Sequence, residues 1–151
     1  GKGMSAALYM AELKGLILSL SQIHLSPRDL LISANRLISM HLDSRSFITM
    51  TYAVIDPAAG VMTYARAGHT PLLHLPAGSA SGGRASILAP DGLVLGLRID
   101  DGERFNSLLS EVTLGLSPGD LLVFFTDGIS EAMNEHSDCF GEPRLAGLIE
   151  R

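Results

Sequence analysis

The sequence LSPGDLLVFFTDGISEAMN, residues 116–134, decides the fold of this chain. Its Ser-Pro-Gly-Asp start predicts a turn, and the apolar run Leu121–Phe125 predicts a strand buried on both faces. Thr126-Asp127-Gly128 follows the run. A carboxylate at the end of a buried strand is where a rigid scaffold presents a ligand to a metal. Because Asp-Gly is also common turn chemistry, these residues alone leave both a metal ligand and a simple turn open.

Downstream of this motif, Ile129–Met133 and Pro143–Arg151 are expected to be helical. Glu131 follows Asp127 by four residues, a spacing that brings two side chains together on one helical turn. A solvated glutamate at a helix start explains Glu131 equally well.

Upstream, the pattern predicts a hairpin. Residues 47–56 (FITMTYAVID) are rich in β-branched and aromatic groups and carry apolar residues on both alternating faces, so we expect a strand buried on both sides. Asp56–Gly60 is a turn sequence, and residues 61–68 are the antiparallel partner. Residues 72–75 and 108–116 predict two further strands, and residues 78–86 predict a flexible surface loop without chemistry.

Two helices are expected before these strands. In the first, Met4–Leu20, apolar residues recur with helical spacing and predict one buried face. The second begins at Ser26, a good capping residue that Pro27 and Asp29 follow in the first turn. The expected inner faces consist of Met4, Ala7, Leu8, Ala11, Gly15 and Leu16 in the first helix, and of Leu30, Leu31, Ala34, Leu37 and Ile38 in the second. Since helices precede and follow the strands, the fold class is α+β with largely antiparallel sheets.

The composition excludes several classes of function. The length of 151 residues and the 46% hydrophobic content suit one domain. A formal charge of −5 and the absence of any basic run argue against nucleic-acid binding. No apolar stretch reaches the roughly 20 residues of a membrane span. The single Cys139 cannot form an internal disulfide, which fits a cytoplasmic protein.

Two further glycine-containing segments are candidates for a site. Gly1-Lys2-Gly3 precedes a helix and offers bare backbone N–H groups to an anion or a tight metal-binding turn, with close packing as the alternative. It does not form the P-loop pattern. His69 follows Gly68, and its imidazole could ligate a metal or, as we favour, fix the loop by a hydrogen bond. No zinc-ligand spacing and no GxSxG nucleophile motif occur.

The segments resemble, in order, one family of enzymes. Residues 1–15 (GKGMSAALYMAELKG), 47–73 (FITMTYAVIDPAAGVMTYARAGHTPLL) and 116–134, followed by Phe140-Gly141-Glu142-x-x-Leu145, are similar to the catalytic domain of bacterial metal-dependent serine/threonine phosphatases of the PPM (PP2C-type) superfamily, in its SpoIIE/RsbU branch. The agreement of three spaced motifs makes the resemblance specific.

The resemblance implies an α-β-β-α sandwich of two sheets with two Mn²⁺ or Mg²⁺ ions at one edge, which would activate water for attack on phosphoserine or phosphothreonine. By the motif, Asp127 is a metal ligand, and Gly128 belongs to the metal site and permits the tight turn there. No catalytic residue beyond the metal ligands is implied. The supporting residues implied are Thr126 and Glu131 around the turn, and Gly1, Gly3, Gly68 and His69 as scaffold.

The sequence also departs from the family pattern. The family's other metal-binding aspartates would lie before Gly1 and after Arg151, so residues 1–151 are expected to be a partial catalytic domain, truncated at both ends. Arg66 and Thr70 stand where the family commonly has asparagine, which puts a polar role there in doubt. Because a hard divalent cation takes six or more oxygen ligands, one carboxylate binds it weakly, and the 151 residues alone are expected to be nearly inactive.

The expected substrate is a phosphorylated regulatory protein, by resemblance an anti-sigma-factor antagonist of the STAS type in a bacterial stress or signalling pathway. A sensor domain in the same polypeptide is expected to act through the helix Met4–Leu20, by moving the adjoining metal ligand. The alternatives are a pseudophosphatase that binds a phosphoprotein without turnover, and a structural domain that forms a homodimer.

Overall fold

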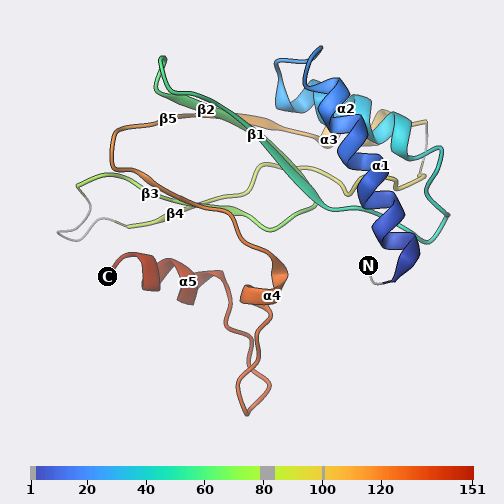
Figure 1. Cartoon of the computed structure of the whole chain (residues 1–151). Coiled ribbons are helices and arrows are strands. Elements are labelled where there is room, and N and C mark those ends of the chain that lie inside the picture. Colours follow the sequence, from blue (N-terminus) through green and yellow to red (C-terminus); the bar gives the residue numbers. More distant parts are fainter. Residues whose placement is uncertain (1–2, 79–83, 100) are drawn as a thin grey trace. The chain divides into compact units, whose positions relative to one another are not determined.

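The structure, a computed structural model, describes residues 3–78, 84–99 and 101–151 (Figure 1). The chain forms two compact units, each of which is described by itself. The first unit comprises Gly1–Asp56, Met62–His69 and Pro90–Thr113, and the second comprises Pro57–Val61, Thr70–Ala89 and Leu114–Arg151. None of the helices in the described ranges has the length and apolar character that a membrane span requires.

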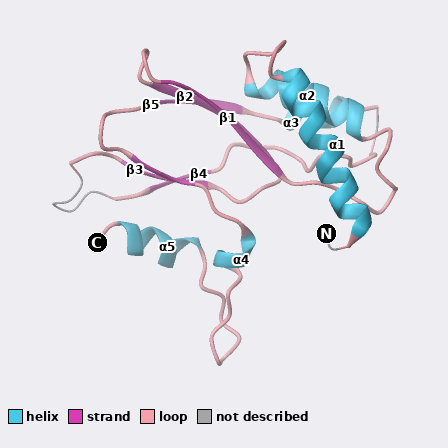
Figure 2. Cartoon of the chain, in the orientation of Figure 1, coloured by secondary structure: helices cyan, strands magenta, loops and turns pink. Residues whose placement is uncertain are grey.

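The first unit combines three helices with most of one three-stranded sheet (Figure 2). The strand order is β1-β2-β5, and the isolated bridge between Ile48 and Leu95 extends the pairing beyond the sheet. The elements are α1 (Met4–Leu20), α2 (Pro27–Ile38), α3 (Glu103–Leu108), β1 (Met50–Asp56), β2 (Val61–Ala67) and β5 (Glu111–Gly115).

The second unit contains the other three-stranded sheet and two short helices. The strand order is β4-β3-β6, and both neighbours of β3 pair with it in antiparallel register: Leu73 lies opposite Ile87 on one side and Val123 on the other. The predicted α+β class with two antiparallel sheets is therefore confirmed. The elements are β3 (Leu72–Leu75), β4 (Ser86–Leu88), β6 (Leu121–Val123), α4 (Asp127–Ser130) and α5 (Glu142–Ile149).

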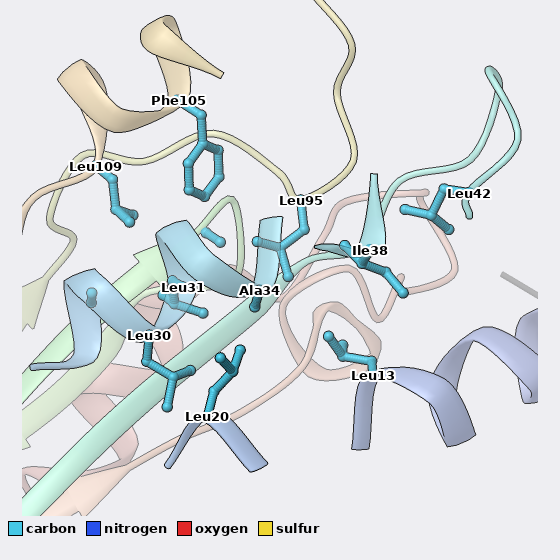
Figure 3. Packing of buried hydrophobic residues seen from close by; sticks show 12 residues of the cluster. Leu13, Leu20, Leu30, Leu31, Ala34, Ile38, Leu42, Leu95, Phe105 and Leu109 are labelled. Carbon is cyan, nitrogen blue, oxygen red and sulfur yellow. The ribbon is translucent and has the colours of Figure 1, made fainter. Parts of the chain in front are cut away.

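The core of the first unit forms where α2 packs on α1 and on β1 (Figure 3). The start of α2 is fixed as predicted, because the Ser26 hydroxyl oxygen accepts a hydrogen bond from the Asp29 N–H at 3.2 Å. Ser26 also donates to Glu111 at 2.7 Å, which ties the start of α2 to β5. The predicted inner face of α2 is confirmed at four positions that are fully buried, namely Leu30, Leu31, Ala34 and Ile38.

The predicted inner face of α1 is wrong at every position except Leu16, which packs against the core. Met4 is 82% exposed and Leu8 is 65% exposed, whereas the buried residues of this helix are Leu13 and Leu20. The cause is the composition of α1, which is apolar on nearly every side, so that periodicity could not identify the packed face.

Two strands are shorter and more exposed than predicted. In β1, which begins at Met50 and not at Phe47, no residue is fully buried. In the predicted strand Leu121–Phe125, β6 ends at Val123 and Phe124 is 51% exposed, while Phe125 is buried. An apolar run alone does not distinguish a strand covered on two faces from one that is partly open.

Other boundaries differ from the prediction by a few residues. The helix expected at 129–133 is α4, which ends at Ser130, and the helix expected at 143–151 is α5. Helix α3 was not predicted, and β4 includes the last residue of the expected loop 78–86. Residues 79–83 of that loop lie outside the described residues.

Candidate functional site

Asp127 is the first residue of α4 and directly follows Thr126, which is extended with φ −112° and ψ 166°. The turn is closed by two backbone hydrogen bonds, from Ile129 N–H to Thr126 O at 3.0 Å and from Glu131 N–H to Asp127 O at 2.7 Å. The Asp127 side chain is exposed and accepts no hydrogen bond from the part of the chain that the structure describes. Its carboxylate oxygens are therefore available to a cation, while its backbone is held.

Gly128 contributes differently from the predicted role, whereas Glu131 supports the turn as expected. Gly128 lies inside α4 without a positive φ, and an added Cβ would meet only Thr126 Oγ1, at an ordinary 3.7 Å. The turn therefore does not need glycine, because it is the start of a right-handed helix. Glu131 supports the turn through its backbone N–H.

The strand end before Asp127 is fixed at Phe125. The Phe125 ring is 6% exposed and belongs to a small core cluster with Leu73, Leu145 and Ala146. The Thr70 hydroxyl donates a hydrogen bond to the Phe125 carbonyl oxygen. Thr70 therefore has a polar role, which its departure from the expected asparagine had put in doubt. This contact escaped the sequence analysis because the two residues are 55 positions apart.

Gly68 and His69 form a tightly constrained loop in the first unit. Gly68 has φ +65°, and a Cβ there would come within 2.4 Å of Val94 Cγ1. The Arg66 guanidinium donates to the carbonyl oxygens of His69 and, at 3.1 Å, of Pro90. His69 Nδ1 lies 3.2 Å from the Thr49 hydroxyl. These are the contacts of a loop-fixing histidine, the interpretation favoured from the sequence.

Gly3 is the N-cap of α1, with φ +92° and ψ −175°. Only glycine adopts this region readily, whereas an added Cβ would meet nothing within 4 Å. The backbone conformation, and not close packing, therefore explains this glycine. Gly1 lies outside the described residues.

Asp120 is a well-connected carboxylate that the sequence analysis treated only as part of a turn. It accepts hydrogen bonds from the N–H groups of Ala77 at 2.7 Å and Ser117 at 3.0 Å, and its Oδ2 lies 3.0 Å from His74 Nε2. The Ala77 and Ser117 N–H groups, followed by His74, lower the pKa of Asp120 to about 2. These three contacts hold both carboxylate oxygens, so Asp120 fixes the start of β6 and differs from Asp127, whose side chain has no partner in the described residues.

A divalent cation centre is incomplete in the described part of the chain. Within that part, no group of three or more His, Cys, Asp or Glu side chains could hold a metal ion. Asp127 has the oxygen donors that Mn²⁺ or Mg²⁺ prefers, yet such a cation takes about six ligands. The structure brings Thr126, Asp127, Gly128 and Glu131 into one turn, and Gly68 and His69 into another. The described residues thus offer the unpartnered carboxylate of Asp127 and do not by themselves form a metal centre.

Comparison with known proteins gives consistent relatives. The chain is 34% identical to phosphoserine phosphatase RsbU of Bacillus subtilis over 151 residues, which cover 99% of this chain and 42% of RsbU. The fold resembles that of the RsbU and RsbW domains of Rv1364c from Mycobacterium tuberculosis, with a TM-score of 0.77, 25% identity, and coverage of 99% of this chain and 39% of that one. It also resembles the SiaA-PP2C domain of Pseudomonas aeruginosa, with a TM-score of 0.76, 18% identity, and coverage of 99% and 56%.

The chain thus spans less than half the length of RsbU and has a PP2C-like fold. The family model for stage II sporulation protein E (SpoIIE) matches residues 1–151. The predicted recognition is confirmed: the chain belongs to the SpoIIE family.

Proposed function

We propose that this chain is part of the catalytic domain of a metal-dependent serine/threonine protein phosphatase. The observation that carries the proposal is Asp127, an exposed carboxylate without a hydrogen-bond partner in the described residues, on a backbone that is held on both sides. The 34% identity to a phosphoserine phosphatase over 151 residues supports it.

In this proposal, Asp127 supplies one ligand of a centre for two Mn²⁺ or Mg²⁺ ions. Bound divalent ions generate a nucleophile from water and neutralise charge on a phosphoryl group. The remaining ligands come from residues that flank the chain in the whole protein. The described residues support this division because no group of three or more His, Cys, Asp or Glu side chains among them could hold a metal ion.

We further propose that the substrate is a phosphorylated regulatory protein of the STAS type in a sigma-factor pathway of the bacterial cytoplasm. The similarity to RsbU, and to a structure that joins RsbU and RsbW domains, supports a regulatory phosphoprotein as the partner. A sensor domain in the same polypeptide would act through α1, whose first residue follows Gly3, a residue with a backbone conformation that glycine alone adopts readily. Replacing Gly3 by a bulky residue should then change activation by the partner, and an unchanged response counts against the switch.

In this proposal, the site is divided: Asp127 lies within residues 1–151, and the remaining metal ligands lie outside them. The division is tested by comparing residues 1–151 with the whole protein. With Mn²⁺ and an aryl phosphate, we expect hydrolysis by the whole protein and none by residues 1–151. Circular dichroism of both samples controls for folding. Comparable activity in the shorter chain would show that the ligands lie within it and would reject the division.

A pseudophosphatase is the second candidate, favoured by the absence of a complete ligand cluster in the described residues. It predicts that the whole protein binds a phosphorylated STAS-type protein but releases no phosphate in saturating Mn²⁺. If the whole protein releases phosphate, and replacing Asp127 abolishes this release, the protein is an enzyme and not a pseudophosphatase.

A further inference from the structure

We infer that Thr70 is a positioning residue for Asp127. Its hydroxyl donates a hydrogen bond to the Phe125 carbonyl oxygen at the strand end, where Pro71 has no N–H to donate. The inference rests on the proposed function, because Asp127 is taken as the metal ligand. It assigns a role to a residue that departs from the asparagine common in the family.

The register of β3 and β6 shows why a side-chain donor acts here. Leu75 pairs with Leu121 and Leu73 with Val123. Two residues further along the same antiparallel register, Pro71 would lie opposite Phe125. Proline cannot donate to a strand neighbour. The Thr70 hydroxyl donates to the Phe125 carbonyl oxygen instead.

The bonded carbonyl is close to Asp127 along the chain. Phe125 precedes Asp127 by two residues, and the Phe125 ring is buried in the core cluster of the second unit. After Asp127, the hydrogen bonds of Ile129 and Glu131 close the turn. The Asp127 carboxylate itself has no partner in the described residues, so its position depends on the backbone on either side. Removing the Thr70 donor takes away the side-chain hydrogen bond of the upstream side, which is then held by the buried Phe125 ring and by the pairing of Val123 with Leu73.

A ligand that is loosely held binds its metal more weakly. Removing a hydrogen bond that orients a metal ligand typically lowers metal affinity about 10- to 100-fold. Because Thr70 acts on Asp127 only through the Phe125 backbone, we expect Thr70→Val, which keeps the shape and removes the donor, to weaken Mn²⁺ binding about tenfold, the low end of that range. Thr70→Ser keeps the donor and should restore binding to within about threefold of the parent.

A matched control separates positioning from general stability. Thr63 in β2 shares a hydrogen bond with Thr113 at 3.0 Å between the two hydroxyl oxygens, and it belongs to the other unit. Thr63→Val makes the same chemical change away from the Asp127 turn. We expect Thr63→Val to lower the melting temperature by an amount similar to Thr70→Val without changing Mn²⁺ affinity.

The experiment uses the whole protein and two readouts. Calorimetric titration with MnCl₂ measures affinity, and hydrogen exchange measures the protection of the amides of Ile129 and Glu131. The inference predicts weaker Mn²⁺ binding and faster exchange in Thr70→Val, with recovery of both in Thr70→Ser. Unchanged affinity in Thr70→Val, or equal weakening in Thr63→Val, overturns it.

The failure of the inference differs from the failure of the proposed function. If the parent protein binds no Mn²⁺ and hydrolyses no phosphate ester, the proposed function fails. The exchange rates then decide by themselves whether Thr70 fixes the turn, and unchanged exchange in Thr70→Val rejects that as well. If the parent is active and Thr70→Val matches it in both readouts, only the role of Thr70 is rejected.

Discussion

Replacing Gly68 by alanine should strongly destabilise the protein, because glycine is required there for two independent reasons. The backbone has φ +65°, in the left-handed region. A Cβ on this backbone would lie 2.4 Å from Val94 Cγ1, 3.1 Å from Val94 N and 3.2 Å from Val94 Cα. The loop cannot move freely to relieve this, since Arg66 holds the carbonyl oxygen of His69, the next residue.

The two effects can be estimated separately. Left-handed backbone costs an L-residue roughly 1–2 kcal/mol. Inserting an extra carbon into a packed site typically costs about 1–3 kcal/mol. Together they predict that Gly68→Ala lowers the free energy of unfolding by about 2–5 kcal/mol. This is a large part of the roughly 5–15 kcal/mol that stabilises an ordinary domain.

Urea unfolding followed by circular dichroism measures this change, with Gly15→Ala as the matched control. Gly15 lies in the middle of α1, and an added Cβ there meets nothing within 4 Å. That substitution should stabilise the helix by up to about 1 kcal/mol. Adding Val94→Ala to Gly68→Ala removes the closest contact, so the double variant should lose about 1 kcal/mol less than the sum of the single variants. A loss below about 1 kcal/mol for Gly68→Ala would refute the reasoning.

Three further predictions concern stability. Ser26→Ala removes the cap of α2 and the bond to Glu111, and should cost about 1 kcal/mol in urea unfolding; an unchanged midpoint contradicts the capping role. Burial raises the pKa of Tyr64 to about 12 from 10.0, so the folded state holds this proton more tightly, and stability present below pH 10 should be lost as the pH rises through about 12. Tyr64→Phe should remove that loss of stability at high pH. Because the Tyr64 hydroxyl has no partner in the described residues, the substitution should also stabilise the folded protein by about 1 kcal/mol. Thermal melts across this pH range test both predictions. The pKa of Asp120 is lowered to about 2 from 3.8, so its contribution is present above pH 3.8 and should be lost as the pH falls through about 2. Asp120→Asn should reduce the fall of the melting temperature at acid pH. An unchanged fall would show that Asp120 does not cause the loss of stability in acid.

The sequence correctly predicted those elements whose ends and buried faces depend on residues close together in the chain. Helix α2 was predicted correctly because its cap and its apolar stripe lie within twelve consecutive residues and their neighbours. The packed face of α1 was predicted wrongly because apolar residues cover most of that helix, so the rest of the fold selects the face. The same holds for Phe124, whose exposure depends on what covers the strand end.

The role of Asp127 as a metal ligand stays a prediction that rests on the order of the motifs. The structure adds that the Asp127 carboxylate is exposed and that backbone hydrogen bonds hold its turn. The contact of Thr70 with Phe125 could not be predicted, because it depends on the register of two strands far apart in the sequence. The expected need for glycine at 128 was inferred from the motif, whereas the turn begins a right-handed helix that accepts other residues.

The most direct test of the central claim is the Mn²⁺-dependent hydrolysis of an aryl phosphate by the whole protein carrying Asp127→Asn. The control is Glu135→Gln, which neutralises an exposed carboxylate outside α4. Asp127 is exposed and its side chain has no partner in the described residues, so the substitution should leave the urea midpoint unchanged. Loss of a metal ligand should lower activity at least about 100-fold and weaken Mn²⁺ binding, while Glu135→Gln stays within about threefold of the parent. Activity and Mn²⁺ affinity of Asp127→Asn equal to those of the parent would contradict the claim that Asp127 binds the metal.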